Sequence, residues 1–222
     1  MRVSPGALTL AFLTLAASGA LEAQQLREDS YRWFIAPQGG IFLFETQTQS
    51  STAIPVVGAQ ALIIGKRGGL IVEYDEALGS EETSAFGDSD APNGVREVTF
   101  DRIRKYSATM MAYPLRSRLE PFIGVGFGIM HTVGTEVDAT FTSPEEASEV
   151  IDEAVDRGST GFGSLVGGVQ YRVSPRLVLY GQYQITTSPA AGKLLIGPTH
   201  TIVGGIRLGL GNAKEGVRGG GY

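Results

Sequence analysis

The sequence has 222 residues, a formal net charge of −5 at pH 7 and no cysteine, which excludes disulfides, zinc–thiolate sites and cysteine nucleophiles. The acidic balance also argues against a nucleic-acid-binding surface. The 31 glycines show no collagen-like period and suit tight hairpins and a closely packed β-barrel wall.

The N-terminal segment is typical of a secretory signal peptide. Arg2 supplies a positive charge, residues 7–17 form a short apolar stretch, and Ala23 is a small residue suited to cleavage. The apolar stretch is well short of the roughly 20 residues that a spanning helix needs, so a transmembrane anchor is the less favoured alternative. The predicted segments are a signal peptide at 1–23, a barrel at 24–211 and a C-terminal tail at 212–222.

Eight segments of the remaining chain have the alternation and length, about ten residues or more, of β-strands that cross a bilayer. They are Arg32–Thr46, Ile54–Gly65, Gly69–Leu78, Glu97–Leu115, Leu119–Val137, Gly161–Val173, Arg176–Ser188 and Thr199–Leu210. Short connections at 66–68, 116–118 and 174–175 alternate strictly with long ones at 47–53, 79–96, 138–160 and 189–198. This alternation is typical of transmembrane barrels, which have short periplasmic turns and longer outer loops.

The strand predicted from Leu119 shows which face meets which environment. Its odd-numbered positions from Ile123 to Ile129 are large and apolar, while Gly124, Gly126 and Gly128 occupy the other face. A narrow closed barrel needs small residues inside, so the apolar face should point outward into lipid. The strand at 176–188 agrees, with apolar residues outward and glutamines inward. A soluble ligand-binding barrel of the lipocalin kind would show the reverse parity.

The stretch from Tyr113 to Gly128 reads Tyr-Pro-Leu-Arg-Ser-Arg-Leu-Glu-Pro-Phe-Ile-Gly-Val-Gly-Phe-Gly, the end of one strand, a tight turn and the start of the next. With the signal peptide and a final glycine-spaced strand, it resembles the small eight-stranded outer-membrane β-barrel proteins of Gram-negative-type bacteria, the OmpA/OmpX-like group. The resemblance covers essentially the whole mature chain. One departure is that such barrels often end on an aromatic residue, whereas Leu210 is followed here by residues 211–222.

The predicted fold is therefore all-β: an eight-stranded antiparallel up-and-down transmembrane β-barrel with a short helix in one long outer loop. The helix is expected after Ser143, where Pro144 and Glu146 complete an N-cap and capping box. Apolar residues then recur at helical spacing up to Gly158. A helix of about twelve residues is marginal alone in water and needs a docking surface. We expect three residues to pack on the barrel mouth or another outer loop as a partial lid, with a partner-binding helix as the alternative: Val150, Ile151 and Ala154.

Charged residues on the inward face form the main candidate site. They are Glu73, Asp75, Glu120, Arg172 and Arg207, all expected nearer the periplasmic ends of their strands. An isolated buried charge is very costly, so opposite charges in a confined lumen should pair. We predict a charge network that keeps the barrel shut, and the alternative is a gate in a narrow pore.

Two arginines on the outward face form a second candidate site. Arg102 and Arg104 share the outward parity of Tyr106, just above the expected bilayer edge. Guanidinium groups pair well with phosphates, so these side chains are candidates for contacts with lipopolysaccharide headgroups. Solvated rim charges are the alternative.

Catalysis has little support in the sequence. The histidines are His131 and His200, and a lipid-modifying hydrolase would need one of them near a Ser or Thr nucleophile and an orienting acid. Neighbouring threonines are a weak signal, and no glycine-flanked nucleophile or metal-ligand spacing is visible. No catalytic residue, cofactor or metal is predicted.

The favoured function is a non-enzymatic integral protein of the cell outer membrane with a structural or surface-interaction role. The alternative is a narrow channel or small-ligand conduit, and a lipid-modifying enzyme is less favoured. The expected partners are outer-membrane lipids and an extracellular ligand that binds the long, acidic loops, with no nucleic acid, and the barrel is expected to be a monomer.

Overall fold

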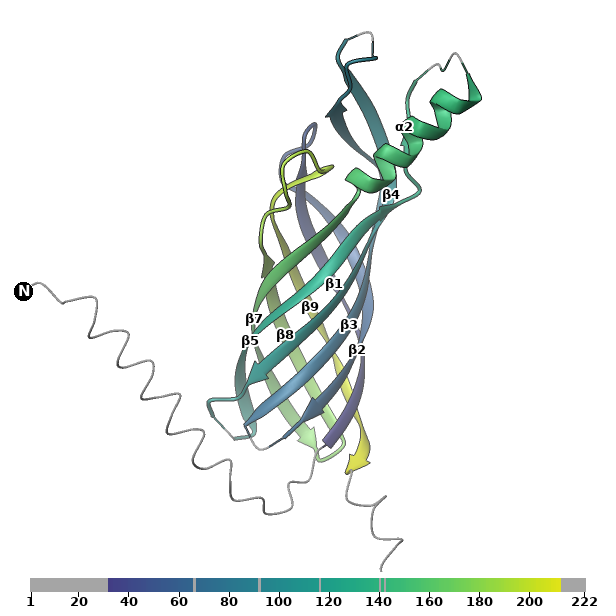
Figure 1. The fold of residues 1–222 in the computed structure, drawn as a ribbon. Coiled ribbons are helices and arrows are strands. Elements are labelled where there is room, and N and C mark those ends of the chain that lie inside the picture. Colours follow the sequence, from purple (N-terminus) through teal and green to yellow (C-terminus); the bar gives the residue numbers. More distant parts are fainter. Residues whose placement is uncertain are drawn as a thin grey trace, which may run out of the picture. The chain divides into compact units, whose positions relative to one another are not determined.

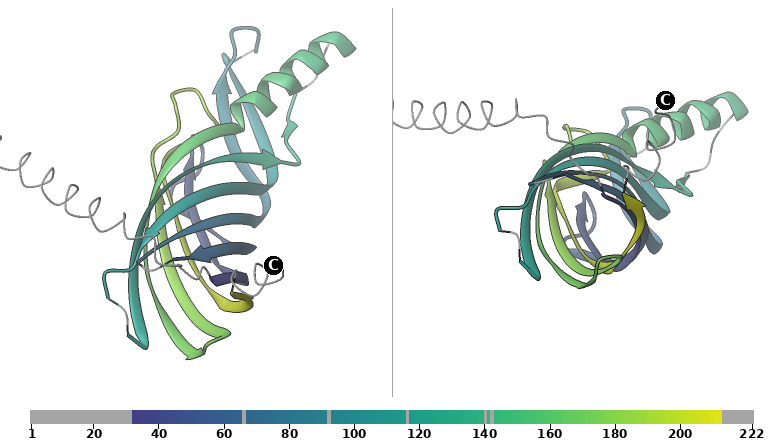
Figure 2. Two further views of the ribbon diagram at one scale, coloured as in Figure 1. Left: turned by 60° about the horizontal axis from the view of Figure 1, so that its bottom comes forward. Right: turned by 90° about the horizontal axis from the view of Figure 1, so that it is seen from below.

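The computed structural model describes residues 32–65, 67–91, 93–115, 117–139, 141 and 143–212. In this part of the chain, eight antiparallel strands form a closed barrel: β1 (Arg32–Thr46), β2 (Thr52–Ile64), β3 (Gly68–Gly87), β4 (Val95–Ala112), β5 (Leu119–Val133), β7 (Ser159–Ser174), β8 (Leu177–Thr186) and β9 (Leu195–Asn212). Consecutive barrel strands pair with each other and β1 pairs with β9, so the ring is closed (Figure 2). The predicted up-and-down barrel is confirmed. The predicted signal peptide lies outside the described residues, as does the tail beyond Asn212.

The two ends of the barrel differ. At one end the connections β2–β3, β4–β5 and β7–β8 are tight turns, and at the other end the chain extends well past the barrel wall (Figure 1). These ends are called the short-turn end and the long-loop end below. The short strand β6 (Glu136–Val137) pairs with β4 at the long-loop end.

The connection predicted as a loop over residues 79–96 is mostly a hairpin, so that prediction is wrong. β3 runs on to Gly87 and β4 begins at Val95, and a bulge between Leu78 and Glu82 shifts their register. Beyond the bulge, buried side chains recur at alternate positions, including Ser84, whose hydroxyl donates to the Leu194 carbonyl at 2.7 Å. Acidic residues and flanking glycines make this segment look like a loop in the sequence. Its alternating residues are buried only by partners that lie elsewhere in the chain, such as Leu194.

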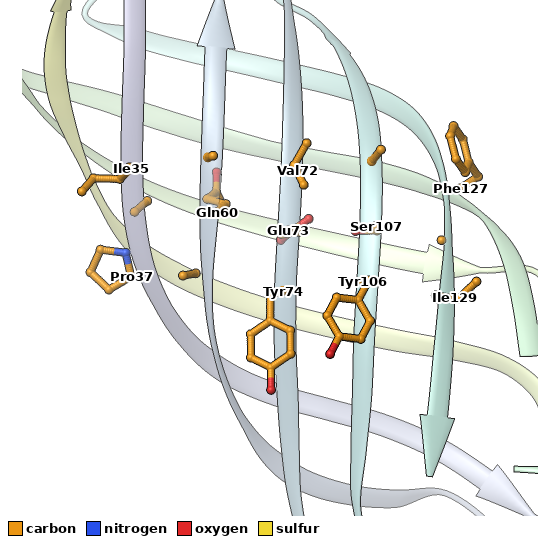
Figure 3. A pocket seen from close by; sticks show the side chains of 15 residues that line it. Ile35, Pro37, Gln60, Val72, Glu73, Tyr74, Tyr106, Ser107, Phe127 and Ile129 are labelled. Carbon is orange, nitrogen blue, oxygen red and sulfur yellow. The ribbon is translucent and has the colours of Figure 1, made fainter. Parts of the chain in front are cut away.

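The outer face of the wall is apolar. Phe127 is 71% exposed and Met110 67%, and Ile, Leu, Val and Tyr side chains occupy outward positions on all the barrel strands. On β8 the exposed Leu179 and Tyr183 alternate with the buried Gln182 and Gln184, as predicted. An exposed apolar area of this extent is foreign to soluble monomers and is what transmembrane barrels present to lipid. A groove in this wall is visible in Figure 3, between Ile35 and Pro37 on one side and Phe127 and Ile129 on the other.

The glycines of β5 face inward because β4 approaches them closely. A Cβ atom added to Gly126 would lie 2.4 Å from the Thr109 hydroxyl oxygen, and one on Gly128 would lie 2.3 Å from the Tyr106 carbonyl oxygen. Neither distance is sterically tolerable, so these positions need glycine. This close approach is the physical reason why the large residues of β5 point outward.

The predicted outer helix is confirmed as α2 (Pro144–Arg157). Ser143 is its N-cap, and the Glu146 amide donates to the Ser143 hydroxyl at 3.1 Å. The helix extends sideways from the long-loop end and does not cross the barrel opening (Figures 1 and 2), so the predicted partial lid is wrong. No helix among the described residues is long and apolar enough to span a membrane.

The orientation of the wall can be tested with Phe127→Arg. Phe127 lies in the outward row next to Tyr106, between the bilayer midplane and its surface, so a lipid-facing arginine there should destabilise the barrel by about 1–3 kcal/mol, because its charge loses water. Urea unfolding of the protein refolded in lipid vesicles would measure the loss. The control is Ser89→Arg, at an exposed position in the tip of the β3–β4 hairpin. Equal stability of the two variants would contradict the assignment of the faces.

Candidate functional site

A network of buried polar side chains crosses the lumen. At its centre Arg207, which is fully buried, donates from Nε and Nη2 to Gln60 Oε1 at 3.1 and 3.0 Å and from Nη1 to Gln170. The Tyr180 ring lies 4.1 Å from its guanidinium carbon. The guanidinium thus exchanges its water for fixed amide acceptors and an aromatic face, which is what a buried cation requires.

Toward the short-turn end the network reaches Glu120. Its carboxylate accepts from Gln170 Nε2 at 2.6 Å and from Arg172 Nη2 at 2.5 Å. Glu120 is buried, whereas the Arg172 side chain is 33% exposed at the barrel rim. Gln170 therefore links the Arg172–Glu120 ion pair to Arg207.

In the other direction the network leads to two adjacent carboxylates. Gln60 donates to Gln38 at 2.8 Å, and Gln38 donates to Glu73 at 2.9 Å and to Asp75 at 2.5 Å. Lys105 Nζ lies 3.0 Å from Asp75 Oδ2. Glu73, Asp75 and Lys105 are all buried, so the Lys105 ammonium offsets the mutual repulsion of two carboxylates that have little water around them.

The structure thus brings the five predicted lumen residues into one network, but their predicted heights are partly wrong. Glu120 and Arg172 lie at the short-turn end, whereas Glu73 and Asp75 lie nearer the middle of the barrel, where Asp75 pairs with Gly58. Sequence analysis also missed Lys105, although its inward parity follows from the outward parity of Tyr106. The predicted network also left out Gln38, Gln60, Gln170 and Tyr180, and it left out Gln182 and Gln184 although these two were predicted to face inward.

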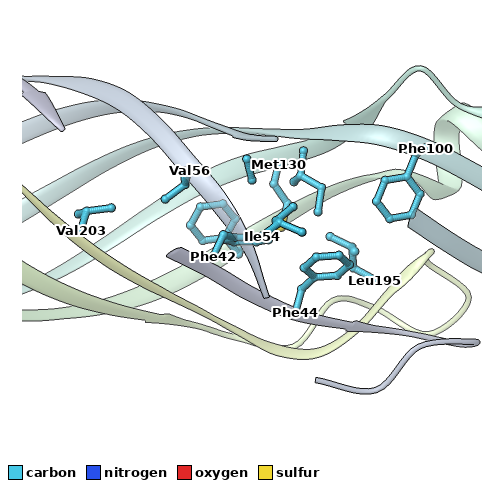
Figure 4. Close-up of a cluster of buried hydrophobic side chains, with 11 residues drawn as sticks. Phe42, Phe44, Ile54, Val56, Phe100, Met130, Leu195 and Val203 are labelled. Atoms are coloured by element: carbon cyan, nitrogen blue, oxygen red, sulfur yellow. The ribbon is translucent and has the colours of Figure 1, made fainter. Parts of the chain in front are cut away.

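Apolar side chains fill the lumen on the long-loop side of this network. Phe42, Phe44 and Phe100 are at most 1% exposed (Figure 4). The ring centroid of Phe44 lies 5.7 Å from that of Phe42 and 6.2 Å from that of Phe100. They belong to a cluster completed by Ile54, Val56, Ala77, Ile103, Met130, Phe162, Leu195 and Val203. We call this cluster the upper plug. It separates the charged network from the long-loop end.

A second cluster, the lower plug, surrounds the network toward the short-turn end. Its members are Phe34, Leu62, Ile64, Ile71, Met111, Tyr113, Phe122, Val166 and Val178. The Phe122 ring lies 5.2 Å from the Arg207 guanidinium carbon, so the apolar and charged groups interleave here. The lumen is therefore filled by apolar as well as polar side chains. It is more apolar than the sequence pattern predicted.

Outside the barrel, α2 docks on the β3–β4 hairpin. Val150 and Ala154 are buried against Phe86, Val98 and Leu194, which agrees with the prediction that they pack on another outer segment rather than on the barrel mouth. Ile151 is 41% exposed, so the prediction that it packs with the other two is wrong. Helical spacing places Ile151 on the apolar side of α2. The hairpin covers only the part of that side that carries Val150 and Ala154.

Ion pairs support this docking from the hairpin side. Arg96 Nε lies 2.7 Å from Asp88 Oδ2, and Arg96 Nη2 lies 3.7 Å from Glu146 of α2. The hydrogen bond from Arg96 keeps the pKa of Asp88 below its ordinary value. From the helix, Arg157 lies over the Phe86 ring, with its guanidinium carbon 4.9 Å from the centroid.

Both histidines lie on the outward aromatic surface. His131 stacks on Tyr106 with ring centroids 5.9 Å apart, and His200 Nδ1 shares a 2.6 Å hydrogen bond with the Tyr183 hydroxyl. Phenol and imidazole rings at this level suit a membrane–water interface. Among the residues that the structure describes, no group of three or more His, Cys, Asp or Glu side chains could bind a metal ion.

The two outward arginines share one carboxylate. Arg102 Nη1 lies 3.3 Å and Arg104 Nε 3.1 Å from Glu76 Oε1, and the Tyr74 hydroxyl donates to Glu76 Oε2 at 3.1 Å. The structure therefore places the predicted arginine pair together, beside the aromatic residues of β3 and β4. This cluster carries two positive charges and one negative charge.

The closed ring, the apolar wall and the filled lumen define the fold of the small eight-stranded outer-membrane β-barrels, as the sequence resemblance implied. The structure matches that of Neisserial surface protein A with a TM-score of 0.53 and 10% identity, over 79% of this chain and 96% of that chain. Lower TM-scores relate it to the N-terminal β-barrel domain of Pseudomonas aeruginosa OprF (0.44, 8% identity, 79% and 97% covered) and to the attachment invasion locus protein Ail of Yersinia pestis (0.40, 11% identity, 82% and 100% covered). No protein-family model and no curated protein matches the sequence. At these identities the likeness shows the fold alone.

The charge balance of the lumen can be tested with Lys105→Met. The substitution leaves Glu73 and Asp75 buried without their cation and should lower the free energy of unfolding by about 3–5 kcal/mol. Adding Asp75→Leu should restore most of the loss, because the uncompensated charge is removed. Urea titration of the refolded barrel would measure both values. A double variant as unstable as the single one would argue against charge pairing as the cause.

The docking of α2 can be tested with Val150→Asp. A carboxylate in the apolar contact should detach the helix and increase protease cleavage between Asp138 and Gly158, while the barrel stays folded. Ile151→Asp is the matched control. The Ile151 side chain is next to Val150 but exposed, so its substitution should leave cleavage unchanged. Equal cleavage of both variants would contradict the observed orientation of the helix.

Proposed function

We propose that the chain is a non-enzymatic integral protein of the cell outer membrane, with a structural or surface-interaction role carried by its long-loop end. The observation that supports this most directly is the filled lumen. A conduit needs an open path, whereas side chains of the upper plug and the polar network occupy this one. Outer-membrane placement is supported by the apolar wall and by the fold shared with Neisserial surface protein A.

The working surface in this proposal is the β3–β4 hairpin with α2. The hairpin carries α2 through the buried contacts of Val150 and Ala154 and through the Arg96 ion pairs, which hold the helix at the long-loop end. The exposed side of α2 combines Ile151 and Val155, which are 41% and 50% exposed, with acidic residues. These exposed carboxylates are Glu145, Glu149, Asp152, Glu153 and Asp156. Such a surface suits an extracellular partner with a basic and partly apolar face.

The charged network supports a second candidate function, a narrow channel. Buried charges at the centre of a barrel can form a gate when the side chains beside them move. In that case the conducting path would follow the residues from Arg172 through Arg207 to Lys105. The upper plug must then open, which the observed packing of Phe42, Phe44 and Phe100 opposes.

Planar-bilayer recording separates the two functions. The sealed barrel should show no steady unit conductance, and Phe42→Ala with Phe44→Ala should increase leakage because it removes part of the upper plug. A steady unit conductance in the unaltered protein that changes with Arg207→Gln or Glu73→Gln would establish the channel instead. Slower migration on a gel after heating, in protein extracted with detergent, checks that the barrel itself is intact.

A further inference from the structure

The outer wall carries a groove of about 840 Å³ that crosses five neighbouring strands, β1 to β5. Its lining is almost entirely apolar. Strand register explains the hollow: one row of outward positions, perpendicular to the strands, consists of Ile35, Ala61, Val72, Ala108 and Phe127. Two alanines in this row, together with Ala59, form a low floor between larger side chains. Phe127, which is 71% exposed, stands at the edge (Figure 3).

The groove ends at an aromatic pair. Tyr74 and Tyr106 face each other on β3 and β4 with ring centroids 5.1 Å apart, and both line the groove. With the Tyr106–His131 stack, they form a patch of the aromatic belt that marks the membrane–water boundary of such barrels. The groove therefore lies on the apolar side of this boundary.

The arginine cluster lies on the polar side of the same boundary. Glu76 and Arg104 pair one step beyond Tyr74 and Tyr106 on the same face, roughly 7 Å farther along the strands, and Arg102 follows. The Arg102 and Arg104 side chains are 45% and 35% exposed although both approach Glu76. One carboxylate for two guanidiniums leaves a positive charge in excess, and guanidinium geometry matches phosphate oxygens.

We propose that the groove and the arginine pair form one binding site for a phosphate-bearing lipid of the leaflet at the long-loop end. An acyl chain lies over Ala59, Ala61 and Ala108, and the phosphate binds Arg102 and Arg104. The inference rests on the proposed outer-membrane location, under which this lipid is the lipid A part of lipopolysaccharide. Tyr74 and Tyr106 separate the two parts of the ligand, as the boundary between acyl chains and headgroups requires.

A second copy of the chain fits this surface less well. A symmetric dimer in a membrane has its twofold axis along the membrane normal, so residues meet residues at the same height and those next to the axis meet their own copies. Arg102 and Arg104 would then approach the same arginines of the partner. The excess positive charge favours an anionic lipid over such a contact.

Native mass spectrometry of the refolded full chain, released from detergent micelles, would test the site with two probes: bisphosphorylated lipid A and its fully dephosphorylated form. The unaltered protein should retain the phosphorylated form about tenfold better, a difference of roughly 1.4 kcal/mol. Arg102→Gln with Arg104→Gln should abolish this preference. Ala61→Phe with Ala108→Phe should fill the groove and reduce retention of both probes.

Matched controls come from the same barrel. Ala112→Phe adds an aromatic side chain to the outward face of β4 outside the groove, and Arg118→Gln removes an exposed charge at the short-turn end. Both should bind the two probes as the unaltered protein does. Undiminished binding by the groove-filled variant, or a dimer that this variant converts to monomer, would overturn the lipid site. Heat-modifiable migration of the same samples tests the barrel separately, and its absence would count against the proposed function itself.

Discussion

Closing an antiparallel sheet with eight strands fixes a lumen that is just wide enough for side chains to fill. The inward side chains must therefore fill the space between them without overlap across the barrel. The outward side chains are free of this limit and face lipid. The inward glycines of β5 show the constraint at its tightest, since a Cβ at Gly126 or Gly128 would overlap β4. Because the inside has no room for the large residues of β5, they form part of the apolar wall, and the membrane character of the exterior follows from the packing of the interior.

The same confinement explains the composition of the lumen network. Three cations, Lys105, Arg172 and Arg207, share the space with three carboxylates, Glu73, Asp75 and Glu120. Glutamine amides connect them, because an amide can donate at one end and accept at the other. Gln60, for example, accepts from Arg207 and donates to Gln38. Such residues allow charges on different strands to be solvated by protein rather than by water. The aromatic residues of the upper plug then exclude water from the long-loop side.

The long-loop end follows a different principle. Here the wall continues as one hairpin, β3–β4, which no longer has neighbours on both sides to form a ring. The apolar face of this hairpin is covered by α2 through Val150 and Ala154. Arg96 adds ion pairs at the edge of the contact. A helix of 14 residues is stabilised by this docking, and the hairpin in turn is shielded by the helix. The result is a projection from the barrel rather than a cover over its mouth.

Local patterns in the sequence determined much of this protein: the eight strands, their inward and outward faces, the alternation of short and long connections, and the N-cap of α2 at Ser143. These properties depend on neighbours within a few residues, so period-two alternation and capping chemistry are sufficient to predict them. The tertiary structure alone decided the heights at which Glu73 and Asp75 lie, the linking role of Gln60 and Gln170, the hairpin beyond Leu78 and the exposure of Ile151. Each of these depends on the stagger of strands around the ring or on a surface contributed by a distant segment, and parity along one strand carries no information about either.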